Sequence, residues 1–226
     1  MNRELPDLAP LIDHALLDPH QGTEAIGRVC DEARHFGFAG VCVASRWVGV
    51  ARQKLPMAGS VKGQTPQLIA VVGFPFGAVP AAIKQAEAIA ALEAGADELD
   101  VVPDFGALAD GNSTAVLDEL AAICDLDRPV KVIVEAGRLS PESLALLVDI
   151  SIDAGVRYLK SGSGFGPPVT VDQVANLRAL ARGRAAVKAS GGIASLEQAL
   201  ELVDAGATRL GTSRGVALMQ SLRHTD

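Results

Sequence analysis

The stretch Ala154-Gly155-Val156-Arg157-Tyr158-Leu159-Lys160, "AGVRYLK", decides the fold, because its seven residues combine a helix end, a turn and a strand. Glycine at the second position supplies the left-handed turn that ends a helix, and the β-type residues that follow predict a strand. Four further segments share the glycine at the second position and an aliphatic residue at the sixth: FGFAGVC (36–42), AGADELD (94–100), RGRAAVK (182–188) and AGATRLG (205–211). The chain therefore repeats a unit in which a strand directly follows a helix.

Runs of β-type residues recur along the whole chain. We expect eight strands, near Leu11–Asp13, Ala39–Val43, Leu68–Val72, Glu98–Val102, Val130–Glu135, Val156–Lys160, Ala185–Lys188 and Thr208–Gly211. Amphipathic helical patterns separate them, for example at Pro80–Glu93, Pro141–Asp153 and Val171–Arg182. This alternation is typical of a parallel sheet with crossover helices.

Eight strands in 226 residues, without a linker or a break in composition, predict an α/β fold. We expect a single (β/α)8 TIM barrel that forms one catalytic domain over residues 1–226. A doubly wound open sheet is the alternative, but no GxGxxG sequence follows the first strand. Among the helix starts, Ser140 before Pro141 predicts an N-cap, and Ser195 and Gln198 have the spacing of a capping box.

The composition is that of an ordinary globular protein, with 49% hydrophobic and 21% charged residues. A net charge of −7 argues against a surface for nucleic acid or an anionic membrane, because both require clustered cations. The cysteines, Cys30, Cys42 and Cys124, form no CxxC pair, which argues against structural zinc and a disulfide framework and fits a reducing cytoplasm. Without a signal-peptide core or an apolar stretch long enough to cross a bilayer, the sequence predicts a cytoplasmic protein.

The alternation of side chains across a strand gives each position of the repeat a direction. The sixth residue faces the helices, and the seventh points into the barrel near the carboxyl end of its strand, where barrels have their active sites. The seventh residues are Cys42, Asp100, Lys160, Lys188 and Gly211. Two lysines, an aspartate and a cysteine are therefore expected to meet at one mouth of the barrel.

The same parity directs Glu98 and Arg209, at the fifth position of the repeat, into the barrel one layer lower. Lys131 can join them. Buried charges must be paired, so we expect a structural ion-pair layer beneath the chemistry. Finding Glu98 and Arg209 on the helix-facing side would contradict the predicted register.

Two lysines at one barrel mouth indicate imine chemistry, because a neutral lysine can attack a carbonyl. An unperturbed lysine, with a pKa near 10.4, is neutral in roughly one molecule in 2,500 at pH 7. A second ammonium about 4 Å away supplies on the order of 4 kcal/mol at an effective dielectric near 20, which is about the perturbation required. Lys160 and Lys188 belong to adjacent predicted strands; in the alternative interpretation both extend to solvent.

Turns rich in glycine and serine follow the last three predicted strands, at residues 161–164, 189–193 and 211–215. Such turns can direct several backbone N–H groups at one anion, and the helix starts that follow add their dipoles. Loops after the seventh and eighth strands are the common phosphate site of barrels. Together with the lysine pair, these turns predict a phosphorylated ligand.

The chain resembles the deoxyribose-phosphate aldolases, which are class I aldolases with a (β/α)8 barrel fold. The shared motifs run nearly from end to end: "IDHALL" at 12–17, "GVCV" at 40–43, "VVGFPFG" at 71–77, "GADELDVV" at 95–102, "KVIVEAG" at 131–137, "LKSGSGF" at 159–165, "VKASGGI" at 187–193 and "GATRLGTSRG" at 206–215.

The resemblance implies that Lys160 forms the Schiff base, that Lys188 perturbs it and that Asp100 is the acid/base partner. It implies that substrate is held by Gly164, Gly191, Gly192, Gly211 and Ser213 at the phosphate and by Asp13 and Cys42 in the pocket. The reaction implied is reversible cleavage of 2-deoxy-D-ribose 5-phosphate to D-glyceraldehyde 3-phosphate and acetaldehyde. No cofactor is expected, and a homodimer is the family expectation.

Three residues depart from the family pattern, each by losing a small polar group. Gly162 and Ala15 stand where the family has a hydroxyl, and Ala136 stands where threonine is common. We expect such losses to affect the choice of substrate or the rate before they affect the imine chemistry.

Two other functions compete with the aldolase. A sugar-phosphate isomerase would require a glutamate base, for which Glu135 is the candidate, and a non-catalytic barrel could bind a phosphosugar without turnover. A metal site is not expected, because His14, His20, His35 and His224 show no ligand spacing. For His14 we favour packing over a role as base.

Overall fold

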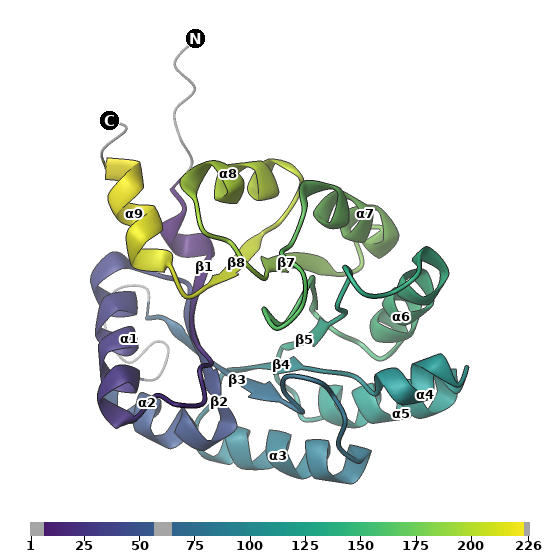
Figure 1. Ribbon diagram of the computed structural model, residues 1–226. Helices are drawn as coiled ribbons and strands as arrows, with labels where there is room; N and C mark the ends of the chain where they lie inside the picture. The colour runs from purple at the N-terminus through teal and green to yellow at the C-terminus, as the bar shows by residue number, and fades with distance from the viewer. Residues whose placement is uncertain (1–6, 57–64, 224–226) are drawn as a thin grey trace.

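A computed structural model describes residues 7–56 and 65–223 of the chain (Figure 1). Eight parallel strands pair in sequence order, and β8 closes on β1 to form a barrel. The strands are β1 (Ile12–Leu16), β2 (Gly40–Ala44), β3 (Gln67–Val72), β4 (Glu98–Val101), β5 (Val130–Ile133), β6 (Tyr158–Lys160), β7 (Ala186–Ser190) and β8 (Arg209–Thr212). The TIM barrel is confirmed and the doubly wound sheet is excluded.

The predicted single domain spans residues 1–226, and its boundaries stay a prediction. The start of the chain, at residues 1–6, and His224 lie outside the described residues.

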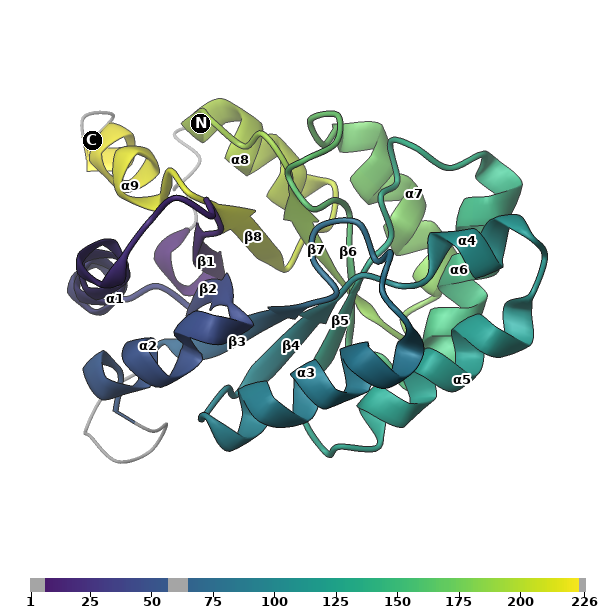
Figure 2. The same ribbon diagram turned by 60° about the horizontal axis from the view of Figure 1, so that its bottom comes forward.

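Helices surround the barrel and cover the outer faces of its strands (Figure 1). They are α1 (Thr23–Phe36), α2 (Val48–Lys54), α3 (Ala81–Glu93), α4 (Phe105–Ala109), α5 (Ser113–Cys124), α6 (Pro141–Asp153), α7 (Val171–Ala181), α8 (Leu196–Asp204) and α9 (Gly215–Arg223), with short 3-10 turns at Ala9–Leu11 and Ser45–Trp47. Figure 2 shows α3 along the outer side of β3 and beside α5. No helix in the described ranges is long and apolar enough to span a membrane.

The repeated glycine fixes where each of five strands begins. All five glycines have positive φ, between 71° and 115°. At Gly206 an added Cβ would lie 2.3 Å from the side chain of Arg178, so a larger residue does not fit there either. The sixth residues of the repeat, Val41, Leu99, Leu159, Val187 and Leu210, are at most 2% exposed and lie in the core between strands and helices. The predicted register is therefore confirmed.

The helix starts agree with the sequence analysis in part. Ser140 caps α6 by accepting the N–H of Ser143, as predicted. Ser195 accepts the N–H of Gln198, but the Gln198 side chain accepts from Ala194 instead of returning to Ser195, so the predicted capping box is only half formed.

The complete capping box lies at the start of α7. The Thr170 hydroxyl accepts the N–H of Gln173, and the Gln173 side chain accepts the N–H of Thr170. This reciprocal pair fixes where the helix begins after the loop that follows β6.

Candidate active site

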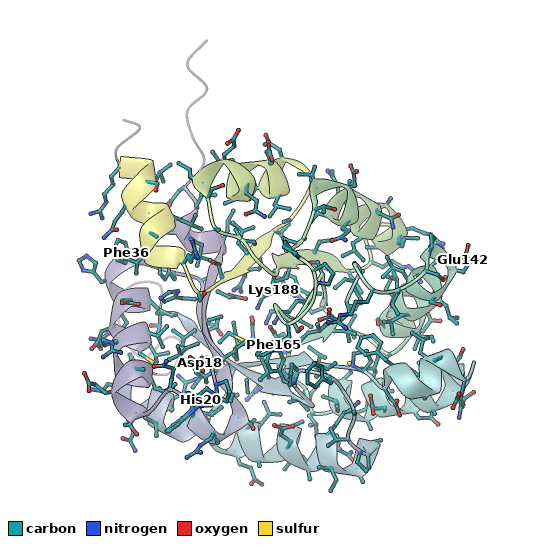
Figure 3. The ribbon with its side chains drawn as sticks, viewed as in Figure 1. Asp18, His20, Phe36, Glu142, Phe165 and Lys188 are labelled. Atoms are coloured by element: carbon teal, nitrogen blue, oxygen red, sulfur yellow. The ribbon has the colours of Figure 1, made fainter. Side chains whose placement is uncertain are left out.

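A cavity of about 450 Å³ opens at the carboxyl ends of the strands, on the side where barrels have their active sites. Lys188 and Phe165 lie near the centre of the barrel in Figure 3. Eight of the residues that the sequence singled out line the cavity: Cys42, Lys160, Gly164, Lys188, Gly191, Gly192, Gly211 and Ser213. The sequence therefore predicted correctly that these residues meet at the carboxyl end of the barrel.

Lys160 and Lys188 meet at one carboxylate oxygen. They are Cα partners across the β6–β7 ladder. Both Nζ atoms donate to Oδ2 of Asp100, at 2.9 Å from Lys160 and 2.8 Å from Lys188. The two side chains are only 3% and 1% exposed. The predicted convergence of two lysines and an aspartate is present.

Asp100, on β4, lies just behind the wall of the cavity and is fully buried. Burial by itself would raise its pKa, but Lys131, Lys160 and Lys188 outweigh burial and hold the pKa well below the usual range. Asp100 is therefore a carboxylate at neutral pH.

Lys188 has a second carboxylate partner, Asp13 of β1, at 2.6 Å. Burial would lower the pKa of Lys188, but Asp100 and Asp13 together raise it. Lys188 is therefore an ammonium at neutral pH. Asp13 is fully buried and is not among the residues that line the cavity. It reaches the cavity through Lys188, and its predicted contact with substrate stays a prediction.

The expected ion-pair layer lies below this site. Glu98 contacts Lys131 directly and lies 3.5 Å from Nη2 of Arg209, so both fifth-position residues face inward. The layer is not separate from the chemistry, however. Lys131 lies 3.1 Å from Oδ1 of Asp100, and Arg209 contacts Asp13. The two layers form one continuous set of charges.

Cys42 lines the cavity from β2, with its Sγ 3.8 Å from Oδ2 of Asp100. Burial, followed by the charge of Asp100, raises the pKa of the Cys42 thiol to about 11. At neutral pH this side chain is a protonated thiol, which fits the prediction that it lines the pocket without reacting.

Glycines form part of the cavity wall. Gly164, Gly191 and Gly192 have φ values of 91°, 110° and 68°, which side chains rarely adopt. At Gly211 an added Cβ would lie 3.0 Å from Cε of Lys188, so the absence of a side chain there leaves room for the lysine. These turns bring backbone without side chains to the cavity that both lysines line.

Arg214 also lines the cavity and was not among the site residues predicted from the sequence. It directly precedes α9, and its N–H donates to the hydroxyl of Thr212. A signal was present in the sequence, because Arg214 is the only cationic residue within the three glycine- and serine-rich turns.

The three departures from the family pattern do not share one pocket. Ala15 lines the cavity. Ala136 is 8% exposed and packs in the outer core. Gly162 accepts a hydrogen bond at its carbonyl from the Ser190 hydroxyl, at 2.5 Å, and does not line the cavity. Of the three, Ala15 alone is placed to affect a substrate by contact.

Glu135, the candidate base of an isomerase, is engaged elsewhere. Its carboxylate accepts the N–H of Ser163 at 2.6 Å and lies 3.6 Å from Nε of Arg138. It lines a neighbouring cavity of about 220 Å³, which shares Ser163 and Phe165 with the main one. Glu135 thus holds the loop that follows β6 through its hydrogen bond from the Ser163 N–H.

His14 faces away from the cavity. Its Nε2 lies 2.8 Å from Oε2 of Glu32, and its ring packs edge-on against Phe38 at 5.2 Å. This geometry agrees with the packing interpretation. Within residues 7–56 and 65–223, no group of His, Cys, Asp and Glu side chains has the geometry to hold a metal ion.

A (β/α)8 barrel that holds two buried lysines and a shared carboxylate at the carboxyl end of its strands has the fold and the site of a class I aldolase. The chain is 48% identical to the deoxyribose-phosphate aldolase of Thermosynechococcus vestitus over 219 residues, which cover 96% of this chain and 98% of that protein. It therefore belongs to the deoxyribose-phosphate aldolase family.

Further relatives agree. A deoxyribose-phosphate aldolase of Thermus thermophilus is 40% identical over 216 residues, covering 94% of this chain and 96% of that protein. The solved structure of the Aeropyrum pernix enzyme, described as tetrameric, superposes with a TM-score of 0.85 at 34% identity and covers 97% of this chain and 92% of that one. No family model matches the sequence.

Proposed function

We propose that this chain catalyses the reversible cleavage of 2-deoxy-D-ribose 5-phosphate to D-glyceraldehyde 3-phosphate and acetaldehyde. The observation that carries the proposal is the buried amine of Lys160, which lines the cavity 2.9 Å from a carboxylate and beside a second amine. Family membership agrees with this reaction.

The first step is addition of neutral Lys160 to the C1 aldehyde of the open-chain sugar. A C–N bond forms, and the carbonyl oxygen takes up a proton to give a carbinolamine. The Lys188 ammonium is close enough to supply that proton. The attacking nitrogen loses a proton in turn, and Asp100, between the two amines, can pass it back to Lys188. Loss of water then gives an iminium.

The iminium is the electron sink for cleavage of the C2–C3 bond. The C3 hydroxyl gives up its proton, C3 becomes the aldehyde of glyceraldehyde 3-phosphate, and the bonding electrons form an enamine between C2 and the lysine nitrogen. Protonation of C2 and addition of water then release acetaldehyde and regenerate the Lys160 amine. Lys160 and Asp100 are buried. Burial favours these reaction steps, because charges interact more strongly where water is excluded.

The phosphate group is assigned to the glycine wall of the cavity. Gly191, Gly192, Gly211 and Ser213 present backbone close to the start of α9, and Arg214 adds a positive charge beside them. Helix N-termini and backbone N–H groups favour anions. This assignment places the aldehyde end of the sugar toward the amines.

The imine is tested by trapping. Acetaldehyde and borohydride should leave an ethyl group irreversibly attached to Lys160, detected by mass spectrometry of the peptide that contains it. Lys160→Met should form no adduct there and should lose cleavage activity. Wild-type protein that forms no adduct, together with a Lys160→Met variant of unchanged activity, would reject the proposal.

A second assay separates the aldolase from the two alternatives. Cleavage of 2-deoxyribose 5-phosphate and of unphosphorylated 2-deoxyribose is measured side by side, with detection of acetaldehyde. An aldolase releases acetaldehyde, faster from the phosphorylated sugar. An isomerase converts the sugar phosphate without acetaldehyde, and a binding protein leaves it unchanged.

The proposed assembly is a homodimer in a reducing cytoplasm. Large apolar side chains remain exposed on the surface, among them Phe76 at 64% and Ile83 at 56%, and a contact between copies would cover such groups. Cys30, Cys42 and Cys124 are free thiols, in keeping with a reducing compartment. Light scattering of the purified protein measures its molar mass in solution. The mass of a monomer would contradict the homodimer.

A further inference from the structure

Seven buried or nearly buried side chains inside the barrel form one continuous set of ion pairs, which we call the barrel charge cluster. It consists of Asp13, Glu98, Asp100, Lys131, Lys160, Lys188 and Arg209. The cluster runs from the cavity at the carboxyl ends of the strands to a second cavity at the opposite end, which Glu98 and Arg209 line.

The barrel charge cluster contains four groups that can be cationic and three carboxylates. With every group ionised, it would hold one positive charge too many in a buried place, which is unfavourable. The charges balance when one amine is neutral. The cluster therefore favours the loss of one proton, and its contacts determine which group loses it.

The contacts single out Lys160. An arginine does not lose its proton in a protein, which removes Arg209. Lys131 lies against Glu98 and Asp100, and Lys188 lies against Asp13 and Asp100, so each has two carboxylate partners.

Lys160 has one carboxylate partner, Asp100, and shares it with Lys188 through the same oxygen. Of the three amines it thus gains the least from a positive charge. Its other facing group is the Cys42 thiol, which is neutral at pH 7 because burial raises its pKa to about 11.

Repulsion by Lys188 alone does not explain a neutral Lys160. The Asp100 oxygen that lies 2.8 Å from Lys188 lies 2.9 Å from Lys160. The negative charge between the two amines attracts a Lys160 ammonium while Lys188 repels it, and the two effects oppose each other. Deeper in the cluster, the charges of Lys131 and Arg209 balance those of Glu98 and Asp13. Loss of one of these two cations would leave a net negative charge that stabilises a Lys160 ammonium.

We propose that Arg209 is a positioning residue for the reaction: from the far end of the barrel charge cluster, it supplies the positive charge that keeps Lys160 neutral. Arg209 acts through Asp13 and Glu98, which it contacts from β8. The Tyr158 ring lies 6.0 Å from its guanidinium, and Lys188 is its Cα partner on β7. It lines the opposite cavity and does not line the one assigned to substrate. The inference rests on the proposed function, in which Lys160 is the nucleophile.

The experiment measures adduct formation on Lys160 as a function of pH. Acetaldehyde and cyanoborohydride are added to wild type and variants over a neutral to alkaline series. The amine replaces the carbonyl oxygen, which leaves as water, and hydride from cyanoborohydride reduces the iminium to an ethylamine. Peptide mass spectrometry gives the extent of modification, and its midpoint in pH reports when Lys160 becomes neutral.

Arg209→Gln removes one positive charge from the cluster, so the midpoint should rise by about one pH unit, which is roughly a tenfold loss of reactive molecules at pH 7. Arg209→Lys keeps the charge and should restore the wild-type midpoint. Glu98→Gln removes a negative charge, so it should move the midpoint in the opposite direction, to lower pH. A merely structural role for these residues does not produce shifts of opposite sign.

Arg52→Gln is the matched control. The Arg52 side chain is 15% exposed, against 13% for Arg209, and it pairs with Asp97 at 2.6 Å outside the cluster. Its loss removes a comparably buried arginine but should leave the midpoint unchanged. Circular dichroism and thermal unfolding establish that each variant is folded.

The outcomes separate the inference from the proposed function. Wild-type protein without a Lys160 adduct overturns the proposed function. A wild-type adduct with an unmoved midpoint in folded Arg209→Gln overturns the inference alone. If Arg209→Gln does not fold, Glu98→Gln decides: a lower midpoint supports the inference, and an unmoved or higher one overturns it.

Discussion

Lys160 and Lys188 stand directly opposite each other on neighbouring strands, and their amines share a single oxygen of Asp100, at 2.9 Å and 2.8 Å. One carboxylate oxygen thus bridges the proposed nucleophile and its neighbouring ammonium. The bridge gives a short path for protons between the two nitrogens, and it makes the charge state of one amine depend on the other.

Replacing Lys188 with methionine should reduce kcat by about 100-fold or more, because the reaction loses a positioned proton donor. Asp13 and Asp100 would also lose an ionic partner. Steady-state cleavage of 2-deoxyribose 5-phosphate measures the effect. Adducts on Lys160 should still form in the variant, but more slowly at neutral pH.

Lys84→Met is the control for that change. Lys84 is another fully buried lysine, paired at 3.0 Å with Glu119 between α3 and α5, away from the cavity. The variant should lose stability but retain the kcat of the wild type in its folded molecules. Equal losses of kcat in both variants would attribute the effect of Lys188 to folding.

Replacing Arg214 with alanine should raise KM for the phosphorylated sugar about tenfold and leave the unphosphorylated sugar unaffected. The reason is the loss of one charge-assisted contact beside the glycine wall. Arg223→Ala, at the other end of α9, removes the same charge from an exposed position and is the control. Equal effects on both sugars would contradict a role at the phosphate.

Replacing Cys42 with alanine should change kcat/KM by no more than about threefold. Its thiol is protonated at neutral pH, because burial and the charge of Asp100 raise its pKa to about 11. Alkylation of Cys42 by iodoacetamide should accordingly be slow at pH 7 in the native protein and fast after unfolding. A loss of activity as large as that of Lys160→Met would assign Cys42 a chemical step.

Acid should destabilise the protein through the barrel carboxylates. The pKa values of Asp13 and Asp100 are lowered on folding, because nearby cations outweigh burial. The unfolded chain therefore binds more protons at low pH, and stability that is present above about pH 4 is lost as pH falls through the folded pKa values.

Urea unfolding between pH 7 and pH 2 measures this loss. Asp13→Asn should be less stable than wild type at pH 7 and should lose less stability on acidification, because one of the two titrating groups is gone. Asp153→Asn, an exposed change at the end of α6, should keep the wild-type pH dependence. A pH dependence unaltered in Asp13→Asn would show that other carboxyls dominate.

The barrel was predictable because a local rule fixes its register. A glycine such as Gly155 ends a helix at a defined residue, and the parity of the next strand then directs Leu159 outward and Lys160 inward. The direction of a strand side chain can therefore be predicted from neighbouring residues alone. The wall residues Cys42 and Gly211 were found by the same rule.

The rest of the site depends on contacts between distant residues. Asp13 joins Lys188 and Arg209 only after the barrel has closed, so the sequence did not reveal that the ion-pair layer continues into the site. The role of Glu135 as an acceptor for the Ser163 N–H depends in the same way on how two loops approach each other. Sequence periodicity carries no information on such pairings.

The ionic interior has a consequence for attempts to make this barrel more heat-resistant. Exchanging buried ion pairs for apolar side chains of similar volume often stabilises a protein. At Glu98, Lys131 and Arg209 the same exchange would change the net charge of the cluster that surrounds the Lys160 amine. Thermostability and reactivity are therefore opposed at these positions, and an engineer who seeks both has to redesign the helical shell instead.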